Sequence, residues 1–222
     1  MPQDIVADAF PRTVGIIGGT GDQGRGLAYR FAVAGIEVLI GSRTAERAKE
    51  AAETFALPNL RGAENKDVAK DCEVAIIAVP WAGHDSTLKE LETYLQGKIV
   101  IDCVNPLGFD EKGAFALNVA EGSACQQAQE LLPSSIVIGA FHSVSSVLLL
   151  DPAVTDLDID VLVLGDDRAA TDQVQALAEI LPGARGIYGG RLRNAGQVEA
   201  FTANLISINR RYKAHSSLRI TL

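Results

Sequence analysis

The chain has 222 residues, of which 47% are hydrophobic and only 5% aromatic, and its formal net charge at pH 7 is −8. This length fits one compact domain with a small appendage, and no apolar stretch is long enough to suggest a membrane-spanning helix. A negative net charge argues against nucleic-acid binding. We therefore expect a globular, soluble protein that binds neither membranes nor nucleic acids.

The N-terminus and the cysteines indicate the compartment. Residues 1–10 contain two aspartates and no basic side chain, whereas a secretory signal begins with positive charge. We expect a cytoplasmic protein with a short disordered tail over these residues. Cys72, Cys103 and Cys125 are odd in number and lack C-x-x-C spacing. This predicts reduced, packed thiols, with neither a disulfide framework nor a metal site.

The most informative segment follows the first predicted strand. The apolar residues 14–17 lead into the pattern G-x-G-x-x-G at Gly19, Gly21 and Gly24, and helical sequence continues over residues 23–31. In dinucleotide-binding folds the first glycine permits a tight turn, the second lets the backbone approach a pyrophosphate, and the third lets the helix pack on the strand. The N-terminus of the helix then faces the phosphates. The segment predicts a dinucleotide site.

The end of the second predicted strand indicates which dinucleotide binds. Residues 37–40 are apolar and lead to Ser42 and Arg43, where NAD-binding proteins carry an acidic residue for the ribose 2′-hydroxyl. A hydroxyl and a guanidinium suit a 2′-phosphate instead. If Thr44 is the N-cap of the next helix, Arg47 is its third residue and faces the same pocket. This pattern predicts NADP; the alternative is that both arginines are solvated surface charges.

Strands and helices continue to alternate along the chain. Further strands are predicted at 60–64, 73–79, 98–102, 136–141, 160–164 and 186–189, and helices or turns at 65–71, 86–95, 124–132, 168–181 and 192–212. A long loop is expected from Asn105. Apolar strands between amphipathic helices predict an α/β fold with a Rossmann-type, doubly wound parallel sheet. We expect an NADP-binding Rossmann domain over residues 12–145 and a small C-terminal α/β appendage over residues 146–222, ending in the long helix.

Ligands of such sheets bind outside the carboxyl ends of the strands, and two of these ends are distinctive. At one, the turn from Val79 to Trp81 places an indole beside the dinucleotide, unless the indole only packs the loop. At the other, His142 is expected to be the only histidine at the mouth of the cleft, and both a structural and a catalytic role are open. His84 and His215 form no metal-ligand pattern.

The C-terminal segment is basic in an otherwise acidic chain. From Arg185 onward there are seven basic residues and one acidic residue, Glu199. Such a cationic end suggests recognition of an anion; the alternative is that these side chains complement the dipole of the last helix. The basic residues are Arg185, Arg191, Arg193, Arg210, Arg211, Lys213 and Arg219.

The predicted last helix also carries an apolar stripe at spacings of three and four residues. The stripe consists of Val198, Phe201, Leu205, Ile208 and Tyr212. It would pack either on its own domain or against a second copy of the chain, so a homodimer is expected as one of two arrangements.

These motifs together resemble one known family. The segments that carry the resemblance are residues 18–24, 41–43, 79–81 and 141–143. In this order they are similar to the NADPH-dependent coenzyme F420 reductases, also called F420H2:NADP oxidoreductases. Residues 105–109, 165–167 and 190–194 resemble the actinobacterial branch in particular. The resemblance covers nearly all of the chain from about residue 13.

The resemblance implies direct hydride transfer between NADP(H) and the deazaflavin coenzyme F420, stacked in a cleft between the Rossmann domain and the C-terminal part. It assigns no catalytic residue, and His142 is considered only as an orienting residue. The residues implied at the phosphates, together with Gly19 of the glycine motif, are Thr20, Gly21, Asp22 and Gln23. Those implied at the 2′-phosphate are Ser42, Arg43 and Arg47. Those implied near the nicotinamide are Val79, Trp81 and Ser146.

Two functions of other classes remain open at this point. An NADP-dependent reductase of a small imine or ketone would need a proton donor near the reduced carbon, and His142 is its candidate. A non-enzymatic NADP sensor would use the C-terminal cations to bind a partner. Loss of F420 absorbance in the presence of NADPH would distinguish the three.

Overall fold

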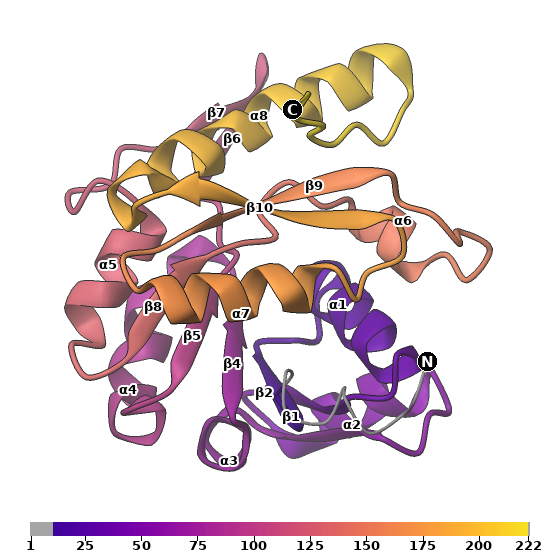
Figure 1. Cartoon of the computed structure of the whole chain (residues 1–222), viewed down its shortest axis with the longest axis vertical. Coiled ribbons are helices and arrows are strands. Elements are labelled where there is room, and N and C mark those ends of the chain that lie inside the picture. Colours follow the sequence, from indigo (N-terminus) through magenta and orange to yellow (C-terminus); the bar gives the residue numbers. More distant parts are fainter. Residues whose placement is uncertain (1–10, 222) are drawn as a thin grey trace.

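An eight-stranded sheet forms the centre of the computed structural model, which describes residues 11–221 (Figure 1). The strand order is β10-β9-β8-β5-β4-β1-β2-β3. The strands are β1 (Thr13–Ile17), β2 (Glu37–Ser42), β3 (Leu60–Glu64), β4 (Val74–Ile77), β5 (Ile99–Asp102), β8 (Ile136–Gly139), β9 (Ile159–Leu164) and β10 (Ala184–Gly190). The tail expected over residues 1–10 lies outside the described range.

The order and direction of the strands confirm the predicted Rossmann-type sheet. From β3 to β8 every neighbouring pair is parallel. Since β1 lies between β2 and β4, the strand order reverses there, and ligands of such folds bind at that point, outside the carboxyl ends of the strands. β9 joins β8 antiparallel through one pair, Gly139 and Leu164, while β10 is parallel to β9. The sheet is therefore mostly parallel.

Helices cover both faces of the sheet (Figure 1). α1, α2 and α7 pack on one face, and α3, α4 and α5 on the other. The helices are α1 (Asp22–Val33), α2 (Ala45–Glu53), α3 (Asn65–Asp71), α4 (His84–Leu95), α5 (Ala124–Leu131), α6 (Ser146–Leu150), α7 (Arg168–Ala178) and α8 (Ala195–Tyr212). Two 3₁₀ turns, η1 (Trp81–Gly83) and η2 (Leu192–Asn194), precede α4 and α8.

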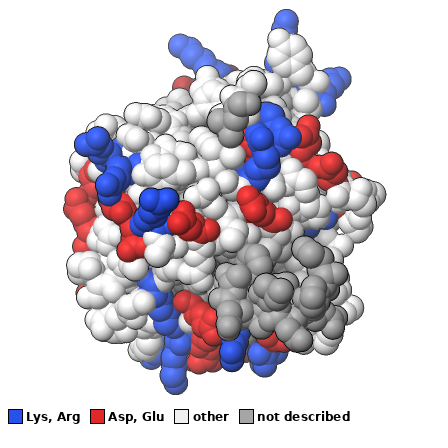
Figure 2. Space-filling view, in the orientation of Figure 1, with Lys and Arg blue, Asp and Glu red and all other residues white. Residues whose placement is uncertain are grey.

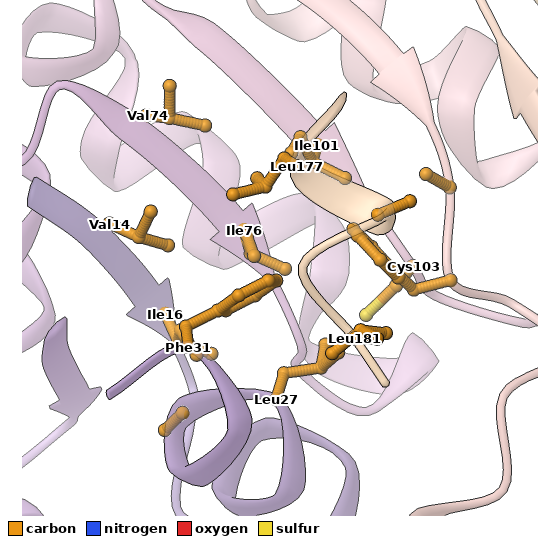
Figure 3. Packing of buried hydrophobic residues seen from close by; sticks show 14 of the residues in the cluster. Val14, Ile16, Leu27, Phe31, Val74, Ile76, Ile101, Cys103, Leu177 and Leu181 are labelled. Carbon is orange, nitrogen blue, oxygen red and sulfur yellow. The ribbon is translucent and has the colours of Figure 1, made fainter. Parts of the chain in front are cut away.

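Strand residues alternate between two hydrophobic layers because successive side chains point to opposite faces of a sheet. Val14 and Ile16 of β1 pack with Phe31 of α1 (Figure 3). Ile17 points to the other face, into the layer that includes Leu88 of α4. These side chains are fully buried, and burial of each contributes about 1.5–3 kcal/mol. Because both layers hold the strands in place, the carboxyl ends of the strands that border the ligand crevice are held in place as well.

Two elements differ from the sequence expectation. The sequence predicts a long loop from Asn105, but the chain forms a hairpin of β6 (Leu107–Asp110) and β7 (Gly113–Ala116). Each strand has only four residues and is half-buried or exposed, so it lacks the apolar run that identifies a buried strand. The five-residue helix α6 is likewise too short to show a periodic pattern.

The long C-terminal helix is confirmed, but its apolar stripe is not one buried face. Leu205 is buried, whereas Phe201 and Ile208 are each 38% exposed and Tyr212 is 73% exposed. The buried positions are Ala195, Glu199, Ala203 and Leu205. Over residues 11–221, none of the helices combines the length and the hydrophobicity that crossing a membrane requires.

Candidate functional site

The glycine loop joins the carboxyl end of β1 to α1. Its left-handed residue is Gly18, with a φ of +70°, rather than Gly19. A Cβ on Gly19 would lie 2.8 Å from the carbonyl oxygen of Ile16, and a Cβ on Gly24 would lie 2.5 Å from Cα of Gly19. Only glycine at these two positions therefore allows the turn and the helix to approach each other this closely. Gly21 has open space where a Cβ would be, so its backbone is accessible to a ligand.

A cavity of about 660 Å³, which we refer to as the Arg43 cavity, opens beside this loop. The residues lining it that the sequence predicts as cofactor contacts are Thr20, Gly21, Ser42, Arg43, Arg47 and Val79. Neither Arg43 nor Arg47 forms an ion pair with another side chain of the described part of the chain. Their charges are thus available to an anion in the cavity.

Thr44 occupies the N-cap position of α2, as the sequence predicts, but its side chain makes no capping hydrogen bond. A helix start without a capping side chain leaves its first amide groups free for another acceptor. Arg47 is the third residue of this helix, where a cation is unfavourable to the helix dipole unless an anion lies nearby. Both features suit a bound phosphate.

Asn65 also lines this cavity and is a residue that the sequence analysis missed. It is the first residue of α3, and its Oδ1 accepts a hydrogen bond from the amide of Gly18 at 3.0 Å. The same oxygen would lie 2.6 Å from a Cβ on Gly41. Asn65 therefore holds the glycine loop against the end of β2. An asparagine after a short strand is common, so the sequence alone does not predict this contact.

A second cavity, of about 400 Å³, lies at the ends of β4, β5 and β8, beside the start of α6, and we refer to it as the His142 cavity. The predicted residues lining it are Gln23, Val79, Trp81, His142 and Ser146. The two cavities share the segment 78–80, so they are adjacent. Gly19 and Asp22 lie outside both linings: Gly19 is buried beneath α1, and Asp22 is exposed at its start.

The expectation that His142 alone reaches this site is wrong, because His215 also lines the His142 cavity. The chain after α8 folds back over it: Lys213 adopts a left-handed conformation with a φ of +53°. The backbone amide and the hydroxyl of Ser216 then bond to Oδ1 of Asn209, at 2.6 and 2.7 Å. A left-handed lysine is not predictable from residue type, since this conformation favours glycine and asparagine.

His142 is itself a buried residue, only 5% exposed. Its Nε2 lies 3.6 Å from Sγ of Cys125, and its carbonyl oxygen accepts bonds from Asn105 and Thr202. Phe141, just before it, has a φ of +64°, an uncommon conformation for a bulky residue. Burial lowers the pKa of His142 to about 4. The imidazole is therefore neutral near pH 7.

The structure also brings Cys125 and His142 together with Glu199, with potential ligand atoms all within 4.8 Å of one another. These three residues lie far apart in the chain and have no metal-ligand spacing. The two oxygens of Glu199 accept bonds from the amides of Ala124 and Cys125, at 2.9 and 3.1 Å, at the start of α5. Burial raises the pKa of Glu199 to about 7. The carboxylate thus caps α5, where the positive end of the helix dipole disfavours a cation.

All three cysteines are free and buried, as predicted. Burial raises the pKa of the Cys72 thiol, and burial likewise raises the pKa of the Cys125 thiol. These groups therefore pack as neutral thiols.

Three of the basic C-terminal residues are paired with carboxylates. Arg185 and Arg219 bond to Asp160, at 2.6 and 3.4 Å, and Arg191 lies 3.6 Å from Asp166. In contrast, Arg210 and Arg211 line a cavity of about 590 Å³ between α8 and the hairpin. Ile206 lines both this cavity and the His142 cavity. Figure 2 shows Lys and Arg side chains projecting at the edge of the molecule where α8 ends.

Comparison with known proteins identifies the family. A family profile described as NADP oxidoreductase, coenzyme F420-dependent, matches residues 13–106. A protein of Methanocaldococcus jannaschii named F420-dependent NADP reductase is 37% identical over 219 residues, covering 94% of this chain and 97% of that protein. The protein of the same name from Methanothermobacter marburgensis is 36% identical over the same shares.

The solved structure of a candidate F420-dependent NADP reductase from Arthrobacter sp. FB24 matches with a TM-score of 0.82 at 26% identity. The match covers 96% of this chain and 100% of the other. The placement in the actinobacterial branch stays a prediction, but the family is established by identity along almost the whole chain. This chain belongs to the family of the F420-dependent NADP reductases.

Proposed function

We propose that this chain is an F420-dependent NADP reductase, which transfers a hydride directly between NADP(H) and coenzyme F420. The observation that carries the proposal is the pair of adjacent cavities on either side of the segment 78–80. One is lined by the glycine loop and by two arginines that form no ion pair within residues 11–221, and the other lies at the strand ends beside Trp81. The relatives that are 36–37% identical over 94% of the chain bear the name of this activity.

In this proposal the Arg43 cavity holds the adenosine half of NADP(H). Ser42, Arg43 and Arg47 bind the 2′-phosphate, because they combine a hydroxyl with two cations that are not engaged elsewhere in the described structure. Thr20 and Gly21 contact the pyrophosphate at the N-terminus of α1, with Asp22 and Gln23 beside it at the start of the helix. Gly19 allows the tight turn beneath them. The open backbone at Gly21 supports this assignment.

The His142 cavity then holds the nicotinamide and the deazaflavin. Val79, Trp81 and Ser146 line it and are proposed to orient the two rings. Nδ1 of His142 and Oδ1 of Asn105 are buried at this wall without a hydrogen-bond partner in the described part of the chain. The two cofactors supply the chemistry of hydride transfer. The protein brings the rings together and excludes water.

The neutral state of His142 favours hydride exchange over the alternatives. A reductase of an imine or a ketone needs a proton donor at the reduced carbon. His142, whose pKa is about 4, is not a proton donor of suitable strength at pH 7. A non-enzymatic sensor would not need a second cavity beside the dinucleotide. We infer that neither alternative describes this chain.

The direct test is turnover by the purified protein. We expect the absorbance of F420 to decrease when NADPH is added, with much slower turnover when NADH replaces it. Absence of any F420 turnover with either nucleotide, in a protein that binds NADPH, would reject the proposed function. Reduction of imines or ketones under the same conditions would identify the first alternative.

We further propose that two copies associate and that residues 146–222 complete the F420 cleft of the domain over residues 12–145. Exposed apolar side chains of α8 and of the hairpin support the association. They are Phe109, Phe115, Phe201, Ile208 and Tyr212. A single-chain protein rarely leaves such a surface uncovered. The cytoplasmic location stays a prediction.

Replacement of His142 by alanine is expected to slow turnover by about tenfold or less, since general acid catalysis, worth about 10²–10⁴, is not involved. The loss would come from misplacement of the deazaflavin. Turnover numbers of both proteins, measured with NADPH and F420 at pH 7, check this. A loss in the larger range with NADPH binding intact would show that His142 transfers a proton.

A second prediction concerns the anionic tail of F420, which carries a phosphodiester and glutamates. Arg210 and Arg211 line a cavity that shares Ile206 with the His142 cavity. Replacing both by alanine should raise the KM for F420 and leave kcat nearly unchanged, as expected for lost uniform binding. Higher salt should weaken F420 binding more than NADPH binding, because exposed charges are screened over about 8–10 Å.

The matched control replaces Arg168 and Arg191, which line a separate cavity at the start of α7. This double variant should keep the wild-type KM for F420. An analogue of F420 without phosphate and glutamates should lose the salt dependence. If the analogue and intact F420 respond equally to salt and to the variants, the arginines of α8 do not bind the tail and only complement the helix dipole.

A further inference from the structure

A fully buried pair of ionisable side chains, His84 and Asp102, lies behind the wall of the His142 cavity. His84 is the first residue of α4 and Asp102 the last of β5, and both are 0% exposed. Nε2 of His84 lies 2.7 Å from Oδ2 of Asp102. Its Nδ1 lies 2.8 Å from Oε1 of Gln127 on α5.

The partners of His84 determine the protonation of its ring. The Asp102 carboxylate only accepts hydrogen bonds, and the amide nitrogen of Gln127 donates to Glu121 at 3.3 Å, so that its oxygen faces His84. A ring whose two nitrogens both face acceptors satisfies them only as the doubly protonated imidazolium. Burial opposes this charge, but Asp102, Gln127 and the more distant Glu199 together raise the pKa of His84 above its usual value.

The same pair contacts two parts of the cavity wall. The rings of Trp81 and His84 lie 5.3 Å apart between centroids, with 33° between their planes. This distance is within the range of a cation–π interaction. Oδ1 of Asp102 accepts a bond from the amide of Val104 at 2.9 Å. Trp81 and Val104 both line the His142 cavity.

We propose that His84, as a buried imidazolium paired with Asp102, is a positioning residue that holds Trp81 and Val104 in the cavity wall where the nicotinamide and the deazaflavin meet. This inference rests on the proposed function for the identity of the two rings. The cation attracts the indole face, and the carboxylate fixes the following backbone. Without the charge, the indole loses its attachment and the stacked rings lose one wall.

Spectroscopy can test the ion pair without any turnover. The chain has three histidines, so nitrogen NMR of the imidazole rings resolves each of them. At pH 7.5 we expect one ring with protons on both nitrogens, and this signal should vanish in His84→Gln. The matched control His215→Gln should remove a different signal. A singly protonated His84 ring in the wild-type protein would overturn the proposal.

Trp81 is the only tryptophan, so its fluorescence reports on the contact directly. Since an adjacent imidazolium quenches indole emission, we expect brighter emission from His84→Gln than from the wild-type protein. The kcat of His84→Gln should fall by about tenfold to a hundredfold, as for a small misplacement of reacting rings. The KM for NADPH, governed by the Arg43 cavity, should stay at the wild-type value.

Asp102→Asn gives a second variant of nearly the same volume. It should leave His84 with a single ring proton at pH 7.5 and reproduce the brighter emission. If His84→Gln folds but keeps both wild-type emission and wild-type kcat, the positioning role is rejected. If the wild-type protein does not convert F420 at all, the proposed function fails, while the NMR and fluorescence results still decide whether the ion pair holds Trp81.

Discussion

The Arg43→Ala protein is expected to show a KM for NADPH about 10- to 150-fold above that of the wild-type protein, with little change in its use of NADH. Arg43 follows Ser42 at the carboxyl end of β2 and lines the cavity beside the glycine loop. Loss of a charged hydrogen bond costs roughly 1.5–3 kcal/mol, which gives this range of affinity. NADH has no 2′-phosphate and so loses nothing.

Initial rates over a range of nucleotide concentrations, with F420 saturating, provide the measurement. Arg61→Ala is the matched control, because Arg61 lies on the neighbouring strand β3 and makes only an exposed ion pair with Glu37. This control should keep the wild-type KM for both nucleotides. Equal activity of the wild-type protein with NADPH and NADH would contradict the assignment of Arg43 to the 2′-phosphate.

The predicted contacts that line the two cavities come mostly from short runs of consecutive residues. The strand, the turn at Gly19 and the start of α1 follow one another, and Ser42 and Arg43 follow β2 directly. At the ends of both β1 and β2, the position of the strand end determines the position of the residues that follow it. The identity of those residues then indicates the ligand. The two cavities therefore contain most of the predicted contacts, although the sequence could not give their shape.

The parts that the sequence could not predict depend on contacts between distant segments. Glu199 caps α5 across 75 positions of the chain, and His84 meets Asp102 from another element. His215 reaches the cavity only because the chain reverses after α8. Neither residue type nor spacing indicates this reversal. The sequence alone therefore places His215 in a C-terminal tail, away from the cavity.

The roles of the basic C-terminal residues also depend on contacts between distant segments. Asp160 lies within the apolar strand β9 and is buried, and a carboxylate in such a place needs cationic partners. The side-chain bonds of Arg185 lower the pKa of Asp160 to about 2. Two arginines that the composition suggests as ligands of an anion therefore fix the C-terminal segment instead. The free cations are fewer than the sequence count implies.

Arg30→Met is expected to lower the free energy of unfolding by about 3–5 kcal/mol, because a buried carbonyl left without a donor costs about 1–3 kcal/mol and three further half-buried carbonyl groups lose their donor too. Arg30 lies on the apolar face of α1 and is only 7% exposed. Its guanidinium donates to four backbone carbonyl groups at 2.8–2.9 Å. The acceptors are Leu148, Leu149, Asp151 and Val154.

These four carbonyl groups belong to the end of α6 and the segment after it, and α6 begins at Ser146 in the wall of the His142 cavity. Arg30→Met should therefore also raise the KM for F420, since α6 loses its attachment to α1. Methionine fills much of the same space, so the loss reports on the hydrogen bonds and not on a cavity. Arg30→Lys should be only partly better, because one ammonium cannot match the planar fork of the guanidinium.

Arg25→Met is the control on the same helix, because Arg25 makes only a weak exposed bond of 3.4 Å to Thr54 and a contact over the Phe55 ring, 5.4 Å from its centroid. Its unfolding free energy should stay within about 1 kcal/mol of the wild-type value, as for most surface substitutions. Denaturant unfolding of the three variants measures the difference at constant slope. Equal stability of Arg25→Met and Arg30→Met would mean that water replaces the guanidinium at the four carbonyl groups. The attachment of α6 would then depend on its apolar contacts with α1, such as the packing of Leu149 against Gly26.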